Sequence, residues 1–478
     1  MKLNLLKFGT TALIWLSGTG LVSAQQVKDQ SGIQLSDLSA FKDPGKTWSI
    51  AENTHASLKI DNELKVTKGV GVLVNISTNK TPGTDLYTDA VYGNVIVELD
   101  YMMAKGANAG IYLQGNYEIQ LMDSWGVLSP SSSDNGGVYE RWDDSKPEGY
   151  KGFGGYAPRQ NASKAPGLWQ HLKIVFQAPK FDASGKKTEN AKIVSAELNG
   201  VMIHENVILF GPTRGASTEE KALGPLRIQG DHGSAAFKNI RITKLEDRMD
   251  SGGNEGRGGA DPIYIDAPSN TMIRSFVDIG RNQRAVHAIS VGSPYKMHYS
   301  YDLDNGLLLM GWHGEFVDAT PMWVGRGDGS SRARGATTLF TRALAPAVAQ
   351  LTTAQTPWPA DSTGTGFRTR GYVMDDEDRP IFKYNIFGSQ VTDAVKIADN
   401  GKKLNRTITI DQSVPNLYIL LARSKAIEEV AKGLYLIDGQ SYYLELDEVS
   451  DKPLIRDLNG QKELVVLLGS KLNYFISF

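Results

Sequence analysis

The chain has 478 residues, more than one hydrophobic core usually supports, so its length predicts two domains. Lysine and arginine nearly balance aspartate and glutamate, and the formal net charge of -2 argues against nucleic acid as a partner. The sequence contains no cysteine, which excludes disulfides, thiolate metal sites, a cysteine nucleophile and a lipid-modified cysteine anchor. Burial of apolar side chains must therefore supply the stability.

The first predicted element is an export signal. Lys2 and Lys7 precede an apolar run from Phe8 to Val22, and the small residues at 22–24 fit a cleavage site. This run is shorter than the roughly 20 apolar residues that a spanning helix needs, and no later run is long enough. We predict a signal peptide at residues 1–24 and an exported protein, periplasmic or extracellular, with neither a membrane span nor a lipid anchor.

Residues 40–246 are predicted to form a β-sandwich of the jelly-roll type. Short segments of alternating apolar and polar residues recur, turn-forming residues separate them, and helical patterns are nearly absent. Asn199-Gly200 predicts a two-residue hairpin between its flanking strands. The expected strands are residues 58–67, 70–76, 91–103, 111–122, 169–177, 191–198, 226–229 and 237–245.

Residues 110–125 carry the most informative pattern, GIYLQGNYEIQLMDSW. One face of the strand expected at 111–122 is apolar, and the other carries amides, a carboxylate and a tyrosine. Such a polar face can orient sugar hydroxyls, so we interpret it as the floor of a carbohydrate-binding cleft. The alternative is the solvated face of an edge sheet. The polar face comprises Tyr112, Gln114, Asn116, Glu118, Gln120 and Met122.

Two acidic residues and two aromatic residues of this region are candidates for the site. Partial burial of Glu118 among amides would raise its pKa toward the working pH, which suits a general acid or base. Asp123 follows the strand and either binds substrate or caps a turn. Trp125 and Tyr139 can stack on a sugar ring or anchor the long loop at 126–166.

Residues 224–233 contain a second polar strand face, followed by a turn. Arg227 and Gln229 share the polar side of a short strand, and Asp231 and His232 lie on the turn between glycines. Because the ordinary pKa of an imidazole suits proton transfer near neutral pH, His232 is a candidate catalytic residue. The alternative is an incidental exposed histidine.

A run of glycines and charged residues at 247–262 predicts a flexible linker. Residues 263–478 are expected to form a second β-rich domain, of sandwich type, with no assigned role. Asn305-Gly306 predicts a hairpin in this domain, and residues 426–432 predict a short helix. Further strands are expected at residues 417–421, 433–437, 441–446 and 463–468.

Metal-binding motifs are weak throughout the sequence. His171, His204 and His232 are too far apart for ligand spacing, and no H-E-x-x-H pattern occurs. The glycine-rich residues 325–329 lack the flanking strand and helix of a phosphate loop. No cofactor is predicted with certainty; a divalent metal is not indicated by the sequence, and the metal requirement stays unknown.

Several of these segments together resemble the 3-keto-disaccharide hydrolase family. The resemblance covers about residues 40–245 and rests on the order and spacing of its motifs. It implies a jelly-roll sandwich like those of concanavalin A-like lectins and glucanases. It also implies cleavage of glycosides oxidised at C3 of glucose, by 3-keto-glucoside 1,2-lyase and 3-keto-2-hydroxy-glucal hydratase activities. The motifs lie at residues 110–125, 136–139, 167–170, 199–200, 224–229, 231–233 and 237–241.

The chemistry of such a substrate indicates roles for the candidate residues. A keto group at C3 acidifies the proton on C2, so a base can remove it and the enolate can expel the oxygen on C1. Two opposed carboxylates are not required. We predict Glu118 and His232 as the proton-transfer pair, without deciding which is the base. The predicted substrate-binding residues are Gln114, Gln120, Asp123, Trp125, Tyr139, Arg227, Gln229 and Asp231.

Two other functions fit the same pattern. A non-catalytic, lectin-like carbohydrate-binding module would show the same strand faces and aromatic loops, and it predicts binding without turnover. A conventional glycosidase would use Glu118 and Asp123 as its carboxylates, and it predicts turnover of unoxidised glycosides. Carbohydrate is the expected partner in all three interpretations.

Overall fold

The computed structural model describes residues 30–246, 261–324, 327–447 and 453–478. Nearly all the regular secondary structure of these residues is strand, and the helical elements are α1 (Thr320–Trp323) and the 3-10 turn η1 (Asp399–Gly401). The predicted all-β class is confirmed. The predicted signal peptide at 1–24 lies outside the described residues, as does most of the predicted linker at 247–262. None of the described helices is long and apolar enough to cross a membrane.

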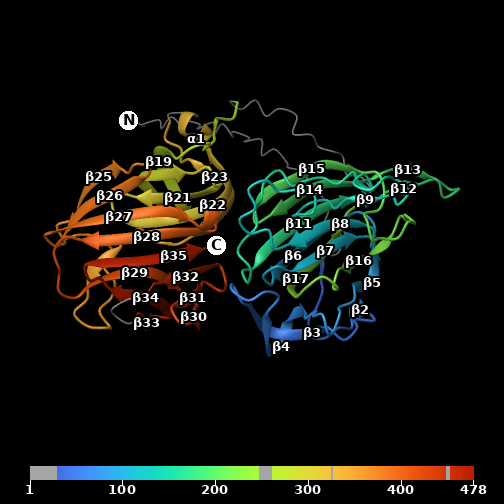
Figure 1. Cartoon of the computed structure of the whole chain (residues 1–478), viewed down its shortest axis with the longest axis horizontal. Helices are drawn as coiled ribbons and strands as arrows, with labels where there is room; N and C mark the ends of the chain where they lie inside the picture. Colours follow the sequence, from blue (N-terminus) through green and yellow to red (C-terminus); the bar gives the residue numbers. More distant parts are fainter. Residues whose placement is uncertain (1–29, 247–260, 325–326, 448–452) are drawn as a thin grey trace, which may run out of the picture.

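Two antiparallel sheets face each other in the first half of the chain, residues 30–246, drawn in blue to green in Figure 1. The order of strands brings sequence-distant strands side by side, as in a jelly roll. The eight-stranded sheet pairs β1 (Gln30–Gly32) with β17 and otherwise has the order β15 (Val201–Leu209), β14 (Ala191–Leu198), β11 (Gln170–Gln177), β6 (Val95–Met103), β17 (Ala235–Lys244), β4 (Leu64–Asn75), β3 (Trp48–Ala56). The five-stranded sheet has the order β2 (Phe41–Lys42), β5 (Leu86–Tyr92), β16 (Gly224–Ile228), β7 (Asn108–Leu113), β8 (Tyr117–Met122). Two short ribbons pair β9 (Arg141–Trp142) with β10 (Gly152–Phe153) and β12 (Lys180–Phe181) with β13 (Lys187–Glu189).

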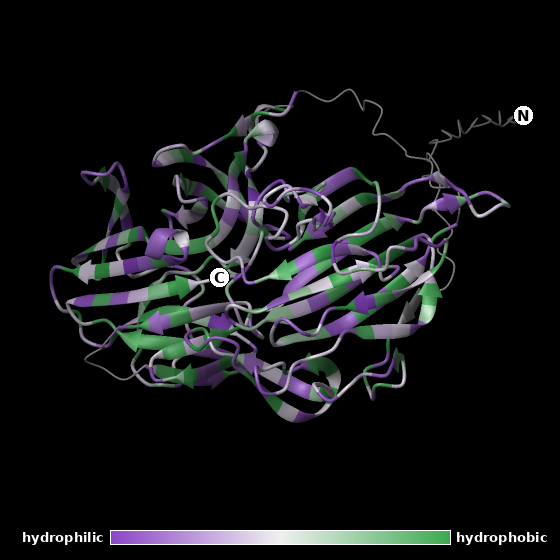
Figure 2. Cartoon of the chain, turned by 45° about the vertical axis from the view of Figure 1, so that its right-hand side comes forward, coloured by the Kyte–Doolittle hydropathy of each residue, from purple (hydrophilic) through white to green (hydrophobic). Residues whose placement is uncertain are grey.

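The core of the first half lies between its two sheets. Val97 and Phe176 of the eight-stranded sheet belong to the same buried cluster as Ile111, Leu121 and Ile228 of the five-stranded sheet. Hydrophilic and hydrophobic residues alternate along many strands, as the banded colours of Figure 2 show. The alternate positions of the five-stranded sheet therefore point away from this core.

The strand predicted at 111–122 is in fact a hairpin. β7 and β8 pair with each other, and residues 114–116 form the turn, with a φ of 54° at Gln114 and 72° at Gly115. The prediction of one continuous strand was wrong because the alternation continues unchanged through this turn. Ile111 pairs with Ile119, so even-numbered residues stay on one face before and after the turn.

The other predicted hairpin of the first half is confirmed. Leu198 pairs with Val201, and the two residues between them have φ values of 52° at Asn199 and 79° at Gly200. Positive φ at both positions is the geometry that Asn-Gly favours in a two-residue turn.

The second half, residues 261–478, contains three antiparallel sheets. The six-stranded sheet pairs β23 (Arg332–Leu339) with β22 and otherwise has the order β18 (Tyr264–Ile265), β22 (Leu307–Asp318), β21 (Met297–Asp302), β20 (Gln283–Gly292), β19 (Thr271–Gly280). The four-stranded sheet has the order β24 (Val348–Gln350), β29 (Leu417–Ser424), β34 (Gln461–Leu467), β33 (Leu454–Leu458). The eight-stranded sheet has the order β25 (Arg368–Met374), β26 (Pro380–Ile386), β27 (Ser389–Ala398), β28 (Lys403–Ile410), β35 (Lys471–Ser477), β32 (Tyr442–Leu446), β31 (Leu434–Ile437), β30 (Ile427–Ala431).

Two sequence predictions in the second half have opposite outcomes. The hairpin at Asn305-Gly306 is confirmed, because Asp302 of β21 pairs with Leu307 of β22. The helix at 426–432 is wrong, because that segment contains the edge strand β30, which pairs with β31. Pairing with a neighbouring strand overrides the weak helix preference of so short a segment.

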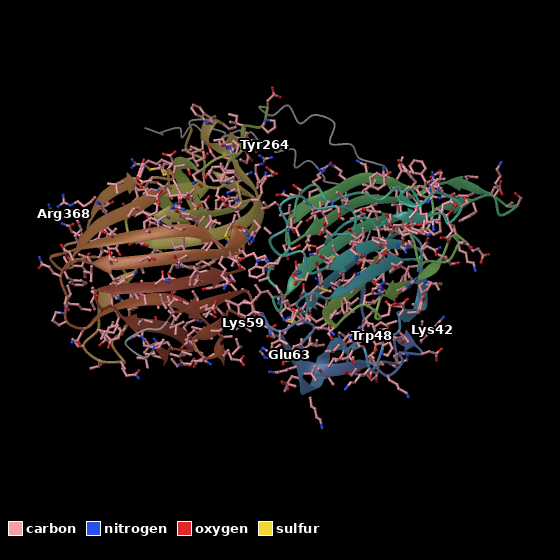
Figure 3. The ribbon with its side chains drawn as sticks, in the orientation of Figure 1. Lys42, Trp48, Lys59, Glu63, Tyr264 and Arg368 are labelled. Carbon is pink, nitrogen blue, oxygen red and sulfur yellow. The ribbon has the colours of Figure 1, made fainter. Side chains whose placement is uncertain are left out.

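The two halves contact each other through an apolar cluster and several hydrogen bonds. Gln440 Nε2 donates to the carbonyl of Thr54 at 2.7 Å, and Lys59 forms an ion pair of 2.9 Å with Glu445. Figure 3 shows Lys59 close to this boundary. Strand pairing among the described residues stays within each half, while the domain limits 40–246, 247–262 and 263–478 stay predictions. The cluster consists of Leu58, Ala165, Leu168, Leu434, Leu436 and Tyr443, with Trp125 packed against it.

Candidate functional site

The five-stranded sheet aligns polar and aromatic residues in a row on its face away from the core. Glu118 of β8 pairs with Tyr112 of β7, and Tyr112 pairs with Arg227 of β16. Arg227 pairs in turn with Tyr87 of β5. Residues directly opposite each other on antiparallel strands point to the same face, so these side chains are neighbours. We call Glu118, Tyr112, Arg227 and Tyr87 the polar row.

Gly110 makes room for the carboxyl group of Glu118. Gly110 pairs with Gln120 of β8, and its carbonyl accepts a hydrogen bond of 2.9 Å from the backbone N–H of Gln229. A Cβ atom at Gly110 would lie 2.2 Å from Glu118 Oε1, closer than real Cβ contacts come. The carboxyl group therefore occupies the space that a side chain at position 110 would fill.

Glu118 is protonated to a large extent at neutral pH. Its side chain is 2% exposed, and this burial raises its pKa to about 8. A hydrogen bond with Tyr112 and the charge of Arg227 lower the pKa in part, whereas the charges of Asp85 and Asp231 raise it. Burial also raises the pKa of Tyr112 above its ordinary value, so its hydroxyl keeps its proton.

Arg227 is held firmly in the polar row. Its Nη2 forms an ion pair of 2.5 Å with Asp85, and its Nη1 donates to the carbonyl of Gly215 at 2.9 Å. The guanidinium carbon lies 4.0 Å from the centre of the Tyr112 ring. These contacts fix a positive charge over the ring of Tyr112, close enough to Glu118 to lower the pKa of its carboxyl group.

Three buried polar atoms on this part of the sheet have no hydrogen-bond partner among the residues that the structure describes. They are Glu118 Oε2, Arg227 Nε and Gln229 Oε1. Buried polar atoms in proteins nearly always have a partner, which here would come from a bound molecule or water. Glu118 lies on β8, Arg227 lies on β16 and Gln229 follows β16, with β7 between the two strands. A ligand lying across β7 could therefore pair with more than one of these atoms.

His232 and Asp231 form a second polar group at the end of β16. The Nδ1 atom of His232 lies 2.5 Å from Asp231 Oδ1, and both side chains are about half exposed. The carbonyl of His232 accepts a hydrogen bond of 3.1 Å from the backbone N–H of Asn108, which begins β7. The charge of Asp231 also acts on the pKa of Glu118. The turn therefore lies at the same region of the sheet as the polar row.

The structure does not place Gln114 beside Glu118. Gln114 lies in the turn between β7 and β8, where its Nε2 donates to the carbonyls of Tyr92 and Ala222. Gln120 remains on the predicted face, and its Nε2 donates to Asn108 Oδ1 at 2.8 Å. The hairpin turn thus separates two amides that a continuous strand would have aligned.

The other predicted contacts at the end of β8 have structural partners. Asp123 Oδ2 accepts a hydrogen bond of 2.9 Å from the backbone N–H of Gly106, which is the turn-capping alternative. Trp125 Nε1 donates to the carbonyl of Phe478 at 3.1 Å, which is the loop-anchoring alternative. Tyr139 is half-buried, and its backbone N–H donates to the carbonyl of Glu118 at 3.1 Å.

Asp85 and Gly110 belong to the site but were not predicted from the sequence. Asp85 immediately precedes β5 and belongs to no motif, so its pairing with Arg227 depends on a long-range strand register. Gly110 carried a usable signal, because a glycine aligned with a polar strand face often marks a close approach. Within the described residues, no group of three or more histidine, aspartate or glutamate side chains is arranged to hold a metal ion.

The raised pKa of Glu118 predicts how stability depends on pH. Below pH 4.5 the carboxyl group is protonated in both the folded and the unfolded chain. As pH rises from 4.5 toward the folded-state pKa of about 8, the unfolded chain releases its proton while the folded chain keeps it, so the free energy of unfolding falls. The stability of the wild type relative to E118Q should therefore fall by up to about 1.4 kcal/mol per pH unit between pH 5 and 8. Urea unfolding at four pH values measures this difference, and parallel curves would contradict the assignment.

Comparison with known proteins supports the family that the motifs predicted. A search of curated proteins gave no match. Among solved structures, a proposed glycosyl hydrolase from Parabacteroides distasonis ATCC 8503 is 22% identical, with a TM-score of 0.32, over 45% of this chain and 84% of its own. The carbohydrate binding module CBM66 from Bacillus subtilis is 10% identical, with a TM-score of 0.21, over 46% of this chain and 99% of its own. Residues 35–243 match the model of the 3-keto-alpha-glucoside-1,2-lyase-like domain family, as the motifs predicted, and the match supports a carbohydrate-active function.

Proposed function

We propose that this protein cleaves the glycosidic bond of 3-keto-glucosides or 3-keto-disaccharides by elimination across C1 and C2, followed by hydration. The observation that carries the proposal is the trio of unpaired buried atoms, Glu118 Oε2, Arg227 Nε and Gln229 Oε1. The family match supports the substrate class. The proposal includes export through the predicted signal peptide at residues 1–24.

The reaction balances without an external oxidant or reductant. A base takes the proton from C2, and the electron pair it leaves is stabilised as an enolate on the C3 oxygen. The pair then forms the double bond between C1 and C2, the bond from C1 to the glycosidic oxygen breaks, and that oxygen takes a proton. Water adds back with its oxygen on C1 and a proton on C2, so the net result is hydrolysis.

The two members of the proton-transfer pair differ in a way that suggests their roles. Glu118, with a pKa of about 8, carries a proton at neutral pH and suits the general acid. His232 suits the base, because a hydrogen bond from its Nδ1 to Asp231 would leave Nε2 free to accept the C2 proton. We therefore propose Glu118 as the acid and His232 as the base, a choice that the sequence left open.

Arg227 and Tyr112 are suited to stabilise the enolate. Arg227 has an unpaired Nε, while Asp85 and Gly215 hold its other nitrogens, so the Nε–H is the donor that we assign to the C3 oxygen. The hydroxyl of Tyr112 keeps its proton because burial raises its pKa. A fixed cation and a neutral donor would thus face the developing negative charge.

The conventional glycosidase alternative is disfavoured by the position of Asp123. Asp123 lies five residues beyond Glu118, roughly 16 Å along an extended strand, whereas glycosidase carboxylates lie about 5 to 9.5 Å apart. Its carboxylate also caps the turn at Gly106. The carbohydrate-binding alternative has the same class of ligand. Turnover distinguishes the two, because a binding module binds the sugar without cleaving it.

The test uses p-nitrophenyl 3-keto-glucoside in deuterium oxide. We expect the wild type to release p-nitrophenol and to place deuterium on C2 of the sugar product. H232Q should lose both activities by at least about 100-fold, the lower range for acid–base catalysis. The matched control is H287Q, because His287 is also half exposed and lies 2.9 Å from Asp304 in the second half.

Other outcomes of this experiment would overturn the proposal. Saturable binding of the substrate with neither cleavage nor deuterium incorporation would assign a carbohydrate-binding module. Turnover of unoxidised p-nitrophenyl glucoside at a comparable rate would assign a conventional glycosidase. Equal activity of H232Q and H287Q would remove His232 from the mechanism.

A further inference from the structure

A polar cleft of about 350 Å³ lies between the two halves of the chain, and no residue of the polar row lines it. Residues 126–130 and 158–161 of the first half line one side of it. Residues 295–296 and 313–315 of the second half line the other side. Its volume falls in the lower part of the range for small-molecule sites, about 300 to 1,000 Å³.

The walls of this cleft are held in place by hydrogen bonds between the halves and within the first half. Gln160 Nε2 donates to the carbonyl of Arg334 at 2.9 Å, and its Oε1 accepts from the backbone N–H of Glu315 at 2.8 Å. Asn161 Nδ2 donates to the carbonyls of Ser124 and Val127 at 2.7 and 2.9 Å. A preformed cleft loses little conformational entropy when a ligand binds.

The charges along the cleft nearly cancel. Lys296 Nζ lies 3.2 Å from Glu315 Oε1, and Arg159 forms an ion pair of 2.9 Å with Glu205. His313 is buried, which lowers its pKa to about 4, so it is neutral at pH 7. This balance does not favour phosphates or other strongly charged ligands and suits a neutral, hydroxylated molecule.

Tyr295 adds an exposed aromatic ring to this polar lining. Its side chain is 42% exposed at the cleft. Aromatic rings pack against the apolar C–H faces of sugars while nearby polar groups bind the hydroxyls. We propose that the cleft between the halves is a second carbohydrate-binding site, which holds a neutral pyranose unit with Tyr295 as its stacking platform. The proposal rests on the carbohydrate class of the proposed function and is independent of its catalytic steps.

The pyranose unit could come from two sources. Residues 126–130 belong to the loop that leaves β8, the strand of Glu118, so the unit could be a further sugar of the substrate whose oxidised glucose lies at the polar row. It could instead be part of a separate, unoxidised glycan. Both sources present the same neutral ring to the cleft.

Calorimetric titration with cellotriose, maltotriose and laminaritriose tests the site in the full chain. We expect at least one trisaccharide to bind the wild type and Y295A to weaken its Kd by at least about tenfold, equivalent to 1.4 kcal/mol. Y295F should bind nearly as the wild type does, because it keeps the ring. Y372A is the matched control, since Tyr372 is also 42% exposed in the second half. Glucose 6-phosphate should not bind the cleft.

Kinetics with Y295A separate the two sources. A raised KM for a 3-keto-disaccharide, with an unchanged KM for p-nitrophenyl 3-keto-glucoside, would identify a further sugar of the substrate. Unchanged KM values with weakened trisaccharide binding would identify a separate glycan. Binding of none of the trisaccharides, or equal binding by Y295A and the wild type, would overturn the site. Binding that depends on Tyr295 in a protein without turnover would reject only the proposed catalysis.

Discussion

Replacement of Glu118 by glutamine is expected to lower kcat on p-nitrophenyl 3-keto-glucoside by about 100-fold to 10,000-fold, the range of general acid–base catalysis. Glutamine has nearly the shape of the protonated carboxyl group that burial favours at neutral pH, but it cannot donate an acidic proton. The fold should therefore persist while the leaving oxygen loses its acid. Initial rates under saturating substrate measure the loss.

The pH profile adds a second readout for the same residue. In the wild type, kcat/KM should fall as pH rises through about 8, because Glu118 then loses the proton that it donates. The residual activity of E118Q should lack this alkaline limb. E148Q serves as the control, since Glu148 is strongly exposed and lies outside the polar row. Wild-type rates in E118Q would exclude Glu118 as the acid.

Replacement of Gly110 by alanine is expected to damage both stability and catalysis. The new Cβ would lie 2.2 Å from Glu118 Oε1, so the carboxyl group or the strand must shift. Overpacking of this kind costs about 1 to 3 kcal/mol of unfolding free energy, and misplacement of a catalytic group by ~1 Å costs about 100-fold in rate. Urea unfolding and initial rates measure the two effects.

A double variant separates the steric cause from other effects. In an E118A background the carboxyl group is absent, so G110A should no longer destabilise the fold. G469A is the matched control, because a Cβ at Gly469 meets nothing within 4 Å. Equal destabilisation by G110A with and without the carboxyl group would show that the clash is not the cause.

The sequence predicted strands such as β11 and β14 of the first half because buried residues recur at nearly every second position along them. β3 lay outside the predicted segments, and β4 spans two of them. Ile111, Leu121 and Ile228 each belong to the apolar side of an alternating segment, and all three lie in the core. The same period concealed the turn at 114–116, since even-numbered residues stay on one face on both sides of it. The segment at 426–432 was misassigned because the partner strand that fixes β30 is a tertiary feature.

The sequence predicted several residues of the candidate site but not how they are arranged. Glu118 and Arg227 each appeared on a polar strand face, but Tyr112 between them emerges only from the register of three strands. Asp85 could not be predicted because its ion pair with Arg227 joins segments that are far apart in the sequence. Trp125 was ambiguous because an aromatic residue in a loop has the same local pattern whether it binds sugar or anchors the loop.

The hydrogen bond from Trp125 to Phe478 ties the loop after β8 to the second half of the chain. Trp125 lies in the loop that leaves β8, and the indole also packs against the apolar cluster shared by the two halves. A protein cut down to residues 35–243 would retain the family's motifs but lose the surface that seats this loop. The segment that carries the family's motifs is thus shorter than the segment that holds their loops in place.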